Sequence, residues 1–69
     1  MGTGTVRSYD KRKGYGYIAP DGGGGHVFVS FREVVRAGLE PLREGQRLRF
    51  RLATESRMRM ATELAGLPV

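Results

Sequence analysis

The sequence predicts a small all-β fold, a five-stranded antiparallel β-barrel, for three reasons. Apolar and polar residues alternate with a period of two in several short runs along the 69 residues. Glycine-rich and polar breaks divide the chain into five such runs. Five short strands close most readily into a barrel, because closure leaves no exposed edge. We expect a single domain over residues 1–69, with a core at about 4–64 and a tail at 65–69.

The first two expected strands lie at residues 5–9 and 14–19, with a polar turn between them. The second is the run GYGYIA, in which Tyr15 and Tyr17 point to one face and Ile18 points to the other. Glycines within this strand allow it to bend sharply, as a small barrel requires.

A glycine-rich break, PDGGGG, separates the second expected strand from the third. No Lys-Ser or Lys-Thr follows the glycines and no helix begins after them, so the P-loop pattern fails and we expect a flexible hairpin loop. The third strand is HVFVSF at residues 26–31. It places Val27 and Val29 on one side and Phe28 and Ser30 on the other.

The C-terminal half predicts a short helix and two more strands. The helix-like stretch is residues 32–40, and we expect only a turn or two of helix there. Residues 46–53 alternate apolar side chains with arginine, which is typical of a half-buried strand with an arginine outer row. The expected inward residues of this strand are Leu48, Phe50 and Leu52. Residues 54–56 turn the chain, and the last strand follows at 57–64, where we expect Met58 and Met60 to fill the barrel.

Composition excludes several classes of protein. The chain has no cysteine, so it can form neither a disulfide framework nor a thiolate zinc site, and a lone His26 cannot form a histidine cluster. Its carboxylates are not paired as an acid/base couple, so we expect no enzymatic activity, cofactor, metal or small-molecule substrate. Neither an apolar signal segment nor an apolar run near the ~20 residues of a membrane span is found. We therefore expect an unexported, cytoplasmic protein that does not bind membranes.

The positive charge of the chain favours a polyanion as its partner. Twelve lysines and arginines against seven carboxylates give a net charge of +5. Lys13 and Arg7 lie at the ends of the strands that carry the aromatic residues, where a phosphate backbone would run.

The aromatic residues are concentrated in two short runs, KGYGYI and VFVSF. If their strands are antiparallel neighbours, the rings of Tyr15, Tyr17 and Phe28 gather on one exposed face, with Phe31 just beyond. Exposing Phe28 gives up about 1.5–3 kcal/mol of burial free energy, so the position needs another use. Stacking of single-stranded nucleobases is such a use, since each base–ring stack contributes about 1–3 kcal/mol.

Two other interpretations of the aromatic residues remain open. The barrel could be inverted, with the rings in the core and Ile18, Val27 and Val29 facing water. Alternatively, the ring-bearing face could be a protein interface or a dimer seam, because exposed apolar patches often have that role. We expect a monomer, with a dimer as the alternative.

These runs together resemble the cold-shock protein family. KGYGYI resembles the family's first ribonucleoprotein motif, Lys-Gly-Phe-Gly-Phe-Ile, and VFVSF resembles the second, Val-Phe-Val-His-Phe. The pattern L-x-E-G-Q at residues 42–46 also lies where the family has it, and the resemblance covers about Gly4 to Leu64. It implies an OB-type barrel that binds single-stranded RNA or DNA without a cofactor and acts as an RNA chaperone or a regulator of transcription or translation.

The resemblance also implies which residues bind. The candidate nucleic-acid-binding residues are Arg7, Ser8, Lys13, Tyr15, Tyr17, Phe28, Ser30 and Phe31. Ser8 stands where the family usually has tryptophan, Ser30 replaces the histidine of the second motif, and Leu39 replaces an aromatic residue. With three stacking partners missing, we expect weaker and more electrostatic binding than is typical of the family. The alternative is a divergent barrel that serves as a protein-interaction or dimerisation module.

Overall fold

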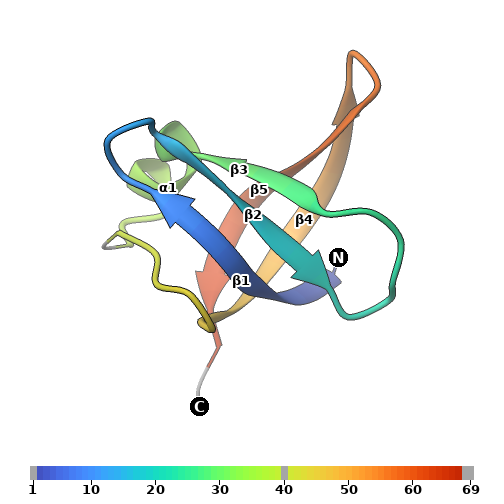
Figure 1. The fold of residues 1–69 in the computed structure, drawn as a ribbon, viewed down its shortest axis with the longest axis horizontal. Coiled ribbons are helices and arrows are strands. Elements are labelled where there is room, and N and C mark those ends of the chain that lie inside the picture. Colours follow the sequence, from blue (N-terminus) through green and yellow to red (C-terminus); the bar gives the residue numbers. More distant parts are fainter. Residues whose placement is uncertain (1, 40, 68–69) are drawn as a thin grey trace.

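The computed structural model describes residues 2–39 and 41–67, which form five strands and one short helix (Figure 1). In chain order these are β1 (Gly2–Asp10), β2 (Tyr15–Pro20), β3 (Val27–Ser30), α1 (Phe31–Arg36), β4 (Arg47–Glu55) and β5 (Met58–Gly66). The strands make a closed barrel in the order β1-β2-β3-β5-β4. The five-stranded barrel expected from the alternation is therefore confirmed.

Strand pairing is antiparallel except where β3 meets β5. β1 pairs with both β2 and β4, β2 pairs with β3, and β4 pairs with β5, all antiparallel. β3 and β5 run parallel, with Phe28 opposite Met60. Alternation predicts that a segment is a strand but does not say which strand becomes its neighbour, so this one parallel pair is a feature that the sequence did not predict.

Aliphatic side chains fill the interior of the barrel. Ile18, Val27 and Val29 have no exposed surface, as their alternation predicts. The inverted barrel, in which these three residues face water, is thereby excluded. The described core residues are Val6, Ile18, Val27, Val29, Val34, Leu42, Leu48, Phe50, Ala61 and Leu64. Full burial of a valine, leucine or phenylalanine contributes about 1.5–3 kcal/mol, which is how a chain without disulfides holds this fold.

The prediction that Met58 and Met60 fill the barrel is wrong. Met58 is 47% exposed and Met60 is half-buried, whereas Ala61 and Leu64, three residues apart, face the interior. The cause is a β-bulge in β5. Between the pairs Arg49–Ala65 and Arg51–Thr62, β5 has two residues where β4 has one. Glu63, with φ of 49°, lies in this bulge. Strict alternation therefore fails within the strand.

Leu52 is also more exposed than its pattern predicts, at 44%. The β4–β5 hairpin continues beyond the rest of the barrel, so its outer part has no sheet packed against it (Figure 1). The two-residue turn at Ser56 and Arg57 has φ of 50° and 68°, the left-handed values of a type I′ turn. Because neither residue is glycine or asparagine, this turn has no strong signal in the sequence, and the expected turn at 54–56 began two residues early.

The ends of two predicted segments differ from the structure. The helix ends at Arg36, and Glu40, the last residue of the helix-like stretch, lies outside the described residues. β5 continues through Gly66, two residues into the stretch expected as a tail, and the Leu67 N–H donates to the Arg47 carbonyl at 3.2 Å. Residues 68–69 of that tail lie outside the described part of the chain.

Arg47 ties the start of the glycine-rich loop to β4. Its guanidinium donates two hydrogen bonds of 2.7 Å to the carboxylate of Asp21, and Thr3 donates a third of 2.6 Å. These hydrogen bonds, from Arg47 first and then from Thr3, hold the pKa of Asp21 well below its usual range. Because that pKa is depressed, the link stabilises the fold above the ordinary pKa of aspartate, near 4, and its contribution is lost progressively as the pH falls below that value.

Candidate nucleic-acid interface

Three aromatic side chains form a cluster on the outside of the barrel, where β2 and β3 lie side by side. Tyr17 is directly opposite Phe28, and Tyr15 is opposite Ser30. The Tyr15 and Phe28 rings are stacked, with centroids 5.5 Å apart and planes at 27°. The Tyr17 ring meets both of them edge-on, at 6.0 Å from Phe28 and 6.1 Å from Tyr15. We call Tyr15, Tyr17 and Phe28 the ring cluster.

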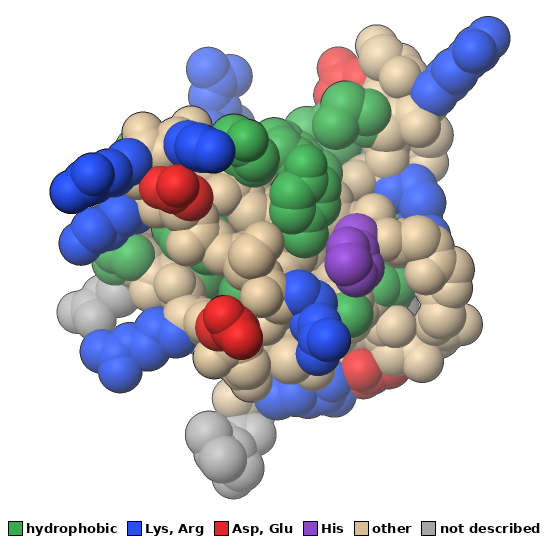
Figure 2. Space-filling model, viewed as in Figure 1, with side chains coloured by type: hydrophobic (Ala, Val, Ile, Leu, Met, Phe, Trp, Pro, Cys, Tyr) green, Lys and Arg blue, Asp and Glu red, His purple; other side chains and the backbone are tan. Residues whose placement is uncertain are grey.

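The ring cluster leaves aromatic surface open to solvent. Tyr17 is 37% exposed, and Tyr15 and Phe28 are half-buried against their neighbours. Figure 2 shows hydrophobic side chains gathered on this face, over β2, β3 and the start of the β4–β5 hairpin, with lysine and arginine side chains around them. The face thus combines flat apolar surface with cations, as a surface for single-stranded nucleic acid requires. The third tyrosine, Tyr9, packs against the core instead, and burial raises its pKa.

Phe31 and Lys13 are brought to the same end of the cluster by the β1–β2 turn. Phe31 is the first residue of α1 and is 51% exposed. Its N–H donates to the Gly14 carbonyl at 2.8 Å, which fixes the helix start to the turn. Asp10 holds the turn itself, since its carboxylate accepts from the Lys13 N–H at 3.2 Å and its carbonyl accepts from the Gly14 N–H at 2.8 Å. The Lys13 side chain is left exposed.

Ser8 lies across from Tyr17 on β1 and leaves a shallow depression beside the ring cluster. The depression has a volume of about 310 Å³, and its lining includes Ser8, Lys13, Tyr15 and Tyr17. The register of β1 against β2 shifts between Val6 and Ser8, so that Arg7 and Ser8 are both exposed. The small serine therefore leaves open the space that a large side chain would cover.

The candidate residue Ser30 and Leu39, which stands where the family has an aromatic residue, have structural roles. Ser30 is the N-cap of α1, and its hydroxyl accepts a hydrogen bond of 3.4 Å from the Glu33 N–H. Leu39 is half-buried and packs against the core. Neither adds a ring to the exposed face.

The structure also places residues at this face that sequence reasoning missed. Met60 is opposite Phe28 in the β3–β5 pair, which extends the apolar surface onto β5. The His26 ring lies 6.3 Å from the Tyr17 ring, at the other edge of the cluster. Alternation alone assigned Met60 to the interior, and only the bulge in β5 reveals its true side.

The arginine row of β4 lies apart from the ring cluster. Arg47 is engaged by Asp21, and Arg51 forms a 3.2 Å ion pair with Glu63 of β5. This agrees with the expectation that the row is a solvated outer surface.

Within the described residues, no group of three or more potential metal ligands is found, and no helix is long and apolar enough to cross a membrane.

Comparisons with known proteins show the family of the chain. Residues 2–67 match the family described as the 'Cold-shock' DNA-binding domain. The chain is 37% identical over 65 residues to cold shock-like protein CspA of Vibrio cholerae, covering 94% of this chain and 93% of the relative. It is 44% identical over 55 residues to the Sinorhizobium fredii protein named "Probable cold shock protein y4cH", covering 80% of each. It is also 42% identical over 48 residues to cold shock protein CapA of Pseudomonas fragi, covering 70% of this chain and 75% of that protein. The chain therefore belongs to the cold-shock domain family.

Proposed function

We propose that this protein binds single-stranded RNA or DNA by stacking bases on the ring cluster while lysine and arginine side chains contact the phosphates. Family membership supports nucleic-acid binding in general. The observation that carries the finer proposal is the side on which Tyr15, Tyr17 and Phe28 lie. They form an aromatic surface outside the barrel, while aliphatic residues fill its interior.

The proposed mechanism needs unpaired bases. In a duplex the bases are already stacked on one another, whereas a single strand can turn its bases onto protein rings. A strand held in this way cannot pair with itself, so the protein would prevent or open weak hairpins without ATP. That activity is what an RNA chaperone or a regulator of transcription or translation would use.

Salt dependence tests the electrostatic part of the proposal. The expected affinity for a labelled single strand falls with salt, with a log–log slope of about −0.7 for each phosphate contact. Fluorescence anisotropy of a fluorescein-labelled ten-nucleotide strand, titrated at several salt concentrations, measures this slope. A hairpin-free duplex of the same length is the control and should bind more weakly. An affinity that does not change with salt would contradict the proposed phosphate contacts.

Substituting Ser8→Trp tests the stacking part of the proposal by addition. The depression beside Tyr17 offers room for an indole, and one further base–ring stack of about 1–3 kcal/mol raises affinity by about 5- to 150-fold. Ser8→Leu is the matched control, because it adds apolar surface without a π face. The same anisotropy titration compares the two variants. Equal affinities for the tryptophan and leucine variants would show that stacking at this position contributes nothing.

A protein-interaction or dimerisation module is the second candidate function. It is favoured by the large exposed apolar side chains on and around the same face, Tyr17, Phe31 and Met58. Sedimentation velocity over a range of protein concentrations distinguishes the two functions. An interaction module requires self-association or a protein ligand, together with no oligonucleotide binding at low salt. The proposed nucleic-acid function requires oligonucleotide binding at low salt by a protein that does not self-associate.

A further inference from the structure

We propose that the nucleic-acid-binding surface continues from the ring cluster onto β5, where Met60 and Met58 contact one or two further bases of the same strand. This inference rests on the proposed function. It adds a base-contacting region that lies outside both aromatic motifs and that the alternation pattern hides.

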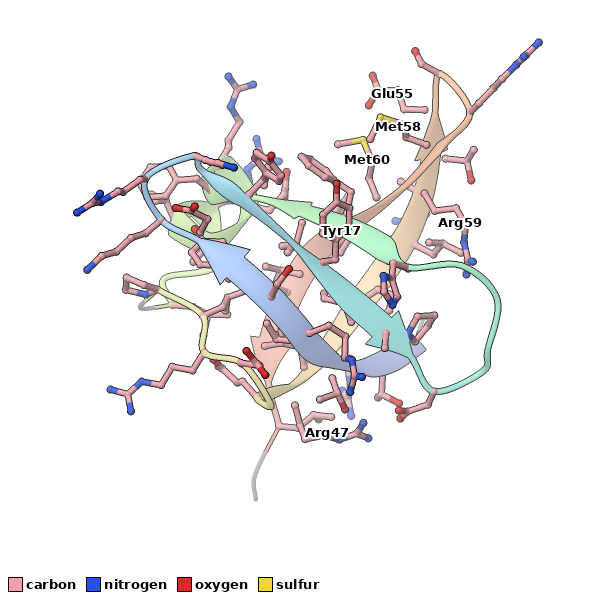
Figure 3. The ribbon with its side chains drawn as sticks, in the orientation of Figure 1. Tyr17, Arg47, Glu55, Met58, Arg59 and Met60 are labelled. Atoms are coloured by element: carbon pink, nitrogen blue, oxygen red, sulfur yellow. The ribbon has the colours of Figure 1, made fainter. Side chains whose placement is uncertain are left out.

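Strand pairing places the two methionines beside the ring cluster. Met60 is directly opposite Phe28, and residues two apart in a strand share a face, so Met58 is next along the outer face of the hairpin. Figure 3 shows the Met58 and Met60 side chains lying beside each other on the hairpin. The apolar surface of the ring cluster therefore continues along β5 without an intervening polar residue on that face.

Packing in the core does not explain why methionine occupies positions 58 and 60. Met58 is 47% exposed, and Met60 is only half-buried. The β5 bulge turns Ala61 and Leu64 inward instead. Thioether groups make favourable contacts with flat π systems, and methionine adapts its shape to different partners. Exposed Met58 and half-buried Met60 can thus accept a base of any identity.

Charged residues on the β4–β5 hairpin indicate how far a bound nucleic-acid strand would extend along it. Arg57 lies at the turn, and the chain has a net charge of +5. Both favour an anionic ligand over a protein that has little net charge. Glu55, by contrast, pairs with Met58 on the same face. Its carboxylate would repel phosphates and so marks the end of the surface. Arg59 lies on the other side of β5 and donates to the Gly25 carbonyl at 2.9 Å, so it is engaged by the glycine-rich loop.

The double variant Met58→Gln/Met60→Gln tests the inference, because glutamine keeps the length of the side chain and removes its apolar character. Anisotropy is measured with labelled oligothymidylates of four, six, eight and ten nucleotides. We expect the double variant to bind the longest strand about two- to tenfold more weakly and the shortest strand with little change. The gain of affinity with length should therefore be smaller than in the wild-type protein.

Leu52→Gln is the matched control. Leu52 is 44% exposed on the same hairpin, but it shares its face with the buried Ala61, opposite to the methionines. Its substitution should leave the length series unchanged. Glu55→Gln provides a result of the opposite sign, since loss of a carboxylate beside the strand should strengthen binding of the ten-nucleotide probe. Circular dichroism melting confirms that each variant is folded.

The inference and the proposed function fail in different ways. If the methionine variant binds every length as the wild-type protein does, while alanine variants of the ring cluster lose binding, the β5 surface is overturned and the proposed function stands. An equal loss in the Leu52→Gln control would also overturn it, because the effect would then not belong to one face. If neither the ring-cluster variants nor the methionine variant changes binding, both proposals are wrong.

Discussion

Simultaneous replacement of Tyr15, Tyr17 and Phe28 by alanine is expected to abolish detectable binding of single-stranded oligonucleotides. Each base–ring stack contributes about 1–3 kcal/mol, and although the losses are not strictly additive, together they should lower affinity by at least about 100-fold. Anisotropy at low salt, where electrostatic binding is strongest, measures the loss. The remaining binding should be weak and should depend on salt alone.

The fold should survive this triple substitution. The three rings lie outside the barrel and pack against one another, whereas Ile18, Val27 and Val29 fill the interior. Some stability will be lost, because Tyr15 and Phe28 are half-buried. Urea denaturation of both proteins separates this loss from the loss of binding, and Leu52→Ala controls for removal of exposed apolar surface. A folded triple variant with wild-type affinity would refute the assignment of the ring cluster as the binding surface.

Gly16→Ala is expected to destabilise the fold strongly. Gly16 is buried where β2 crosses close to β1, and a Cβ there would overlap the Ser8 carbonyl oxygen and lie 2.7 Å from Tyr9 Cα. Backbone atoms cannot move aside without breaking the β1–β2 ladder. A cost of about 2–4 kcal/mol is a large part of the ~3–10 kcal/mol expected for a domain of this size.

Gly22→Ala is the matched control for this substitution. Gly22 lies in the glycine-rich loop, and a Cβ there would meet no atom within 4 Å. Replacing it should change the free energy of unfolding by no more than about 0.5 kcal/mol. Thermal melting followed by circular dichroism compares the two variants. A Gly16→Ala protein as stable as the Gly22→Ala protein would contradict the close approach of β1 and β2.

Local sequence patterns predicted which side chains of β2 and β3 face the interior and which face outward. Strict alternation holds through β2 and β3, so Ile18, Val27 and Val29 were correctly assigned to the core and the rings to the outside. The same rule failed in β5, because a bulge shifts every side chain beyond it to the other face. Glu63 and Leu64, at the bulge, are neither glycine nor proline, so the bulge has no signal in the sequence and the exposure of Met58 could not be predicted.

Contacts between residues far apart in the chain could not be predicted from the sequence either. The parallel β3–β5 pair and the Arg47–Asp21 link join residues far apart in the chain, and periodicity carries no information about such partners. Ser30 illustrates a related limit. Its position in the second motif suggested a binding role, while its hydroxyl in the structure caps α1. A serine three residues before a glutamate is the capping-box pattern, which could have indicated that role from the sequence.

Intermolecular NOE measurements on the protein bound to a single-stranded oligonucleotide show directly which side chains touch the bases. We expect contacts between base protons and the ring protons of Tyr15, Tyr17 and Phe28, with none to the side chains of Arg49 and Arg51 on β4. Base contacts confined to the β4 arginines, with the three rings unaffected, would contradict this expectation.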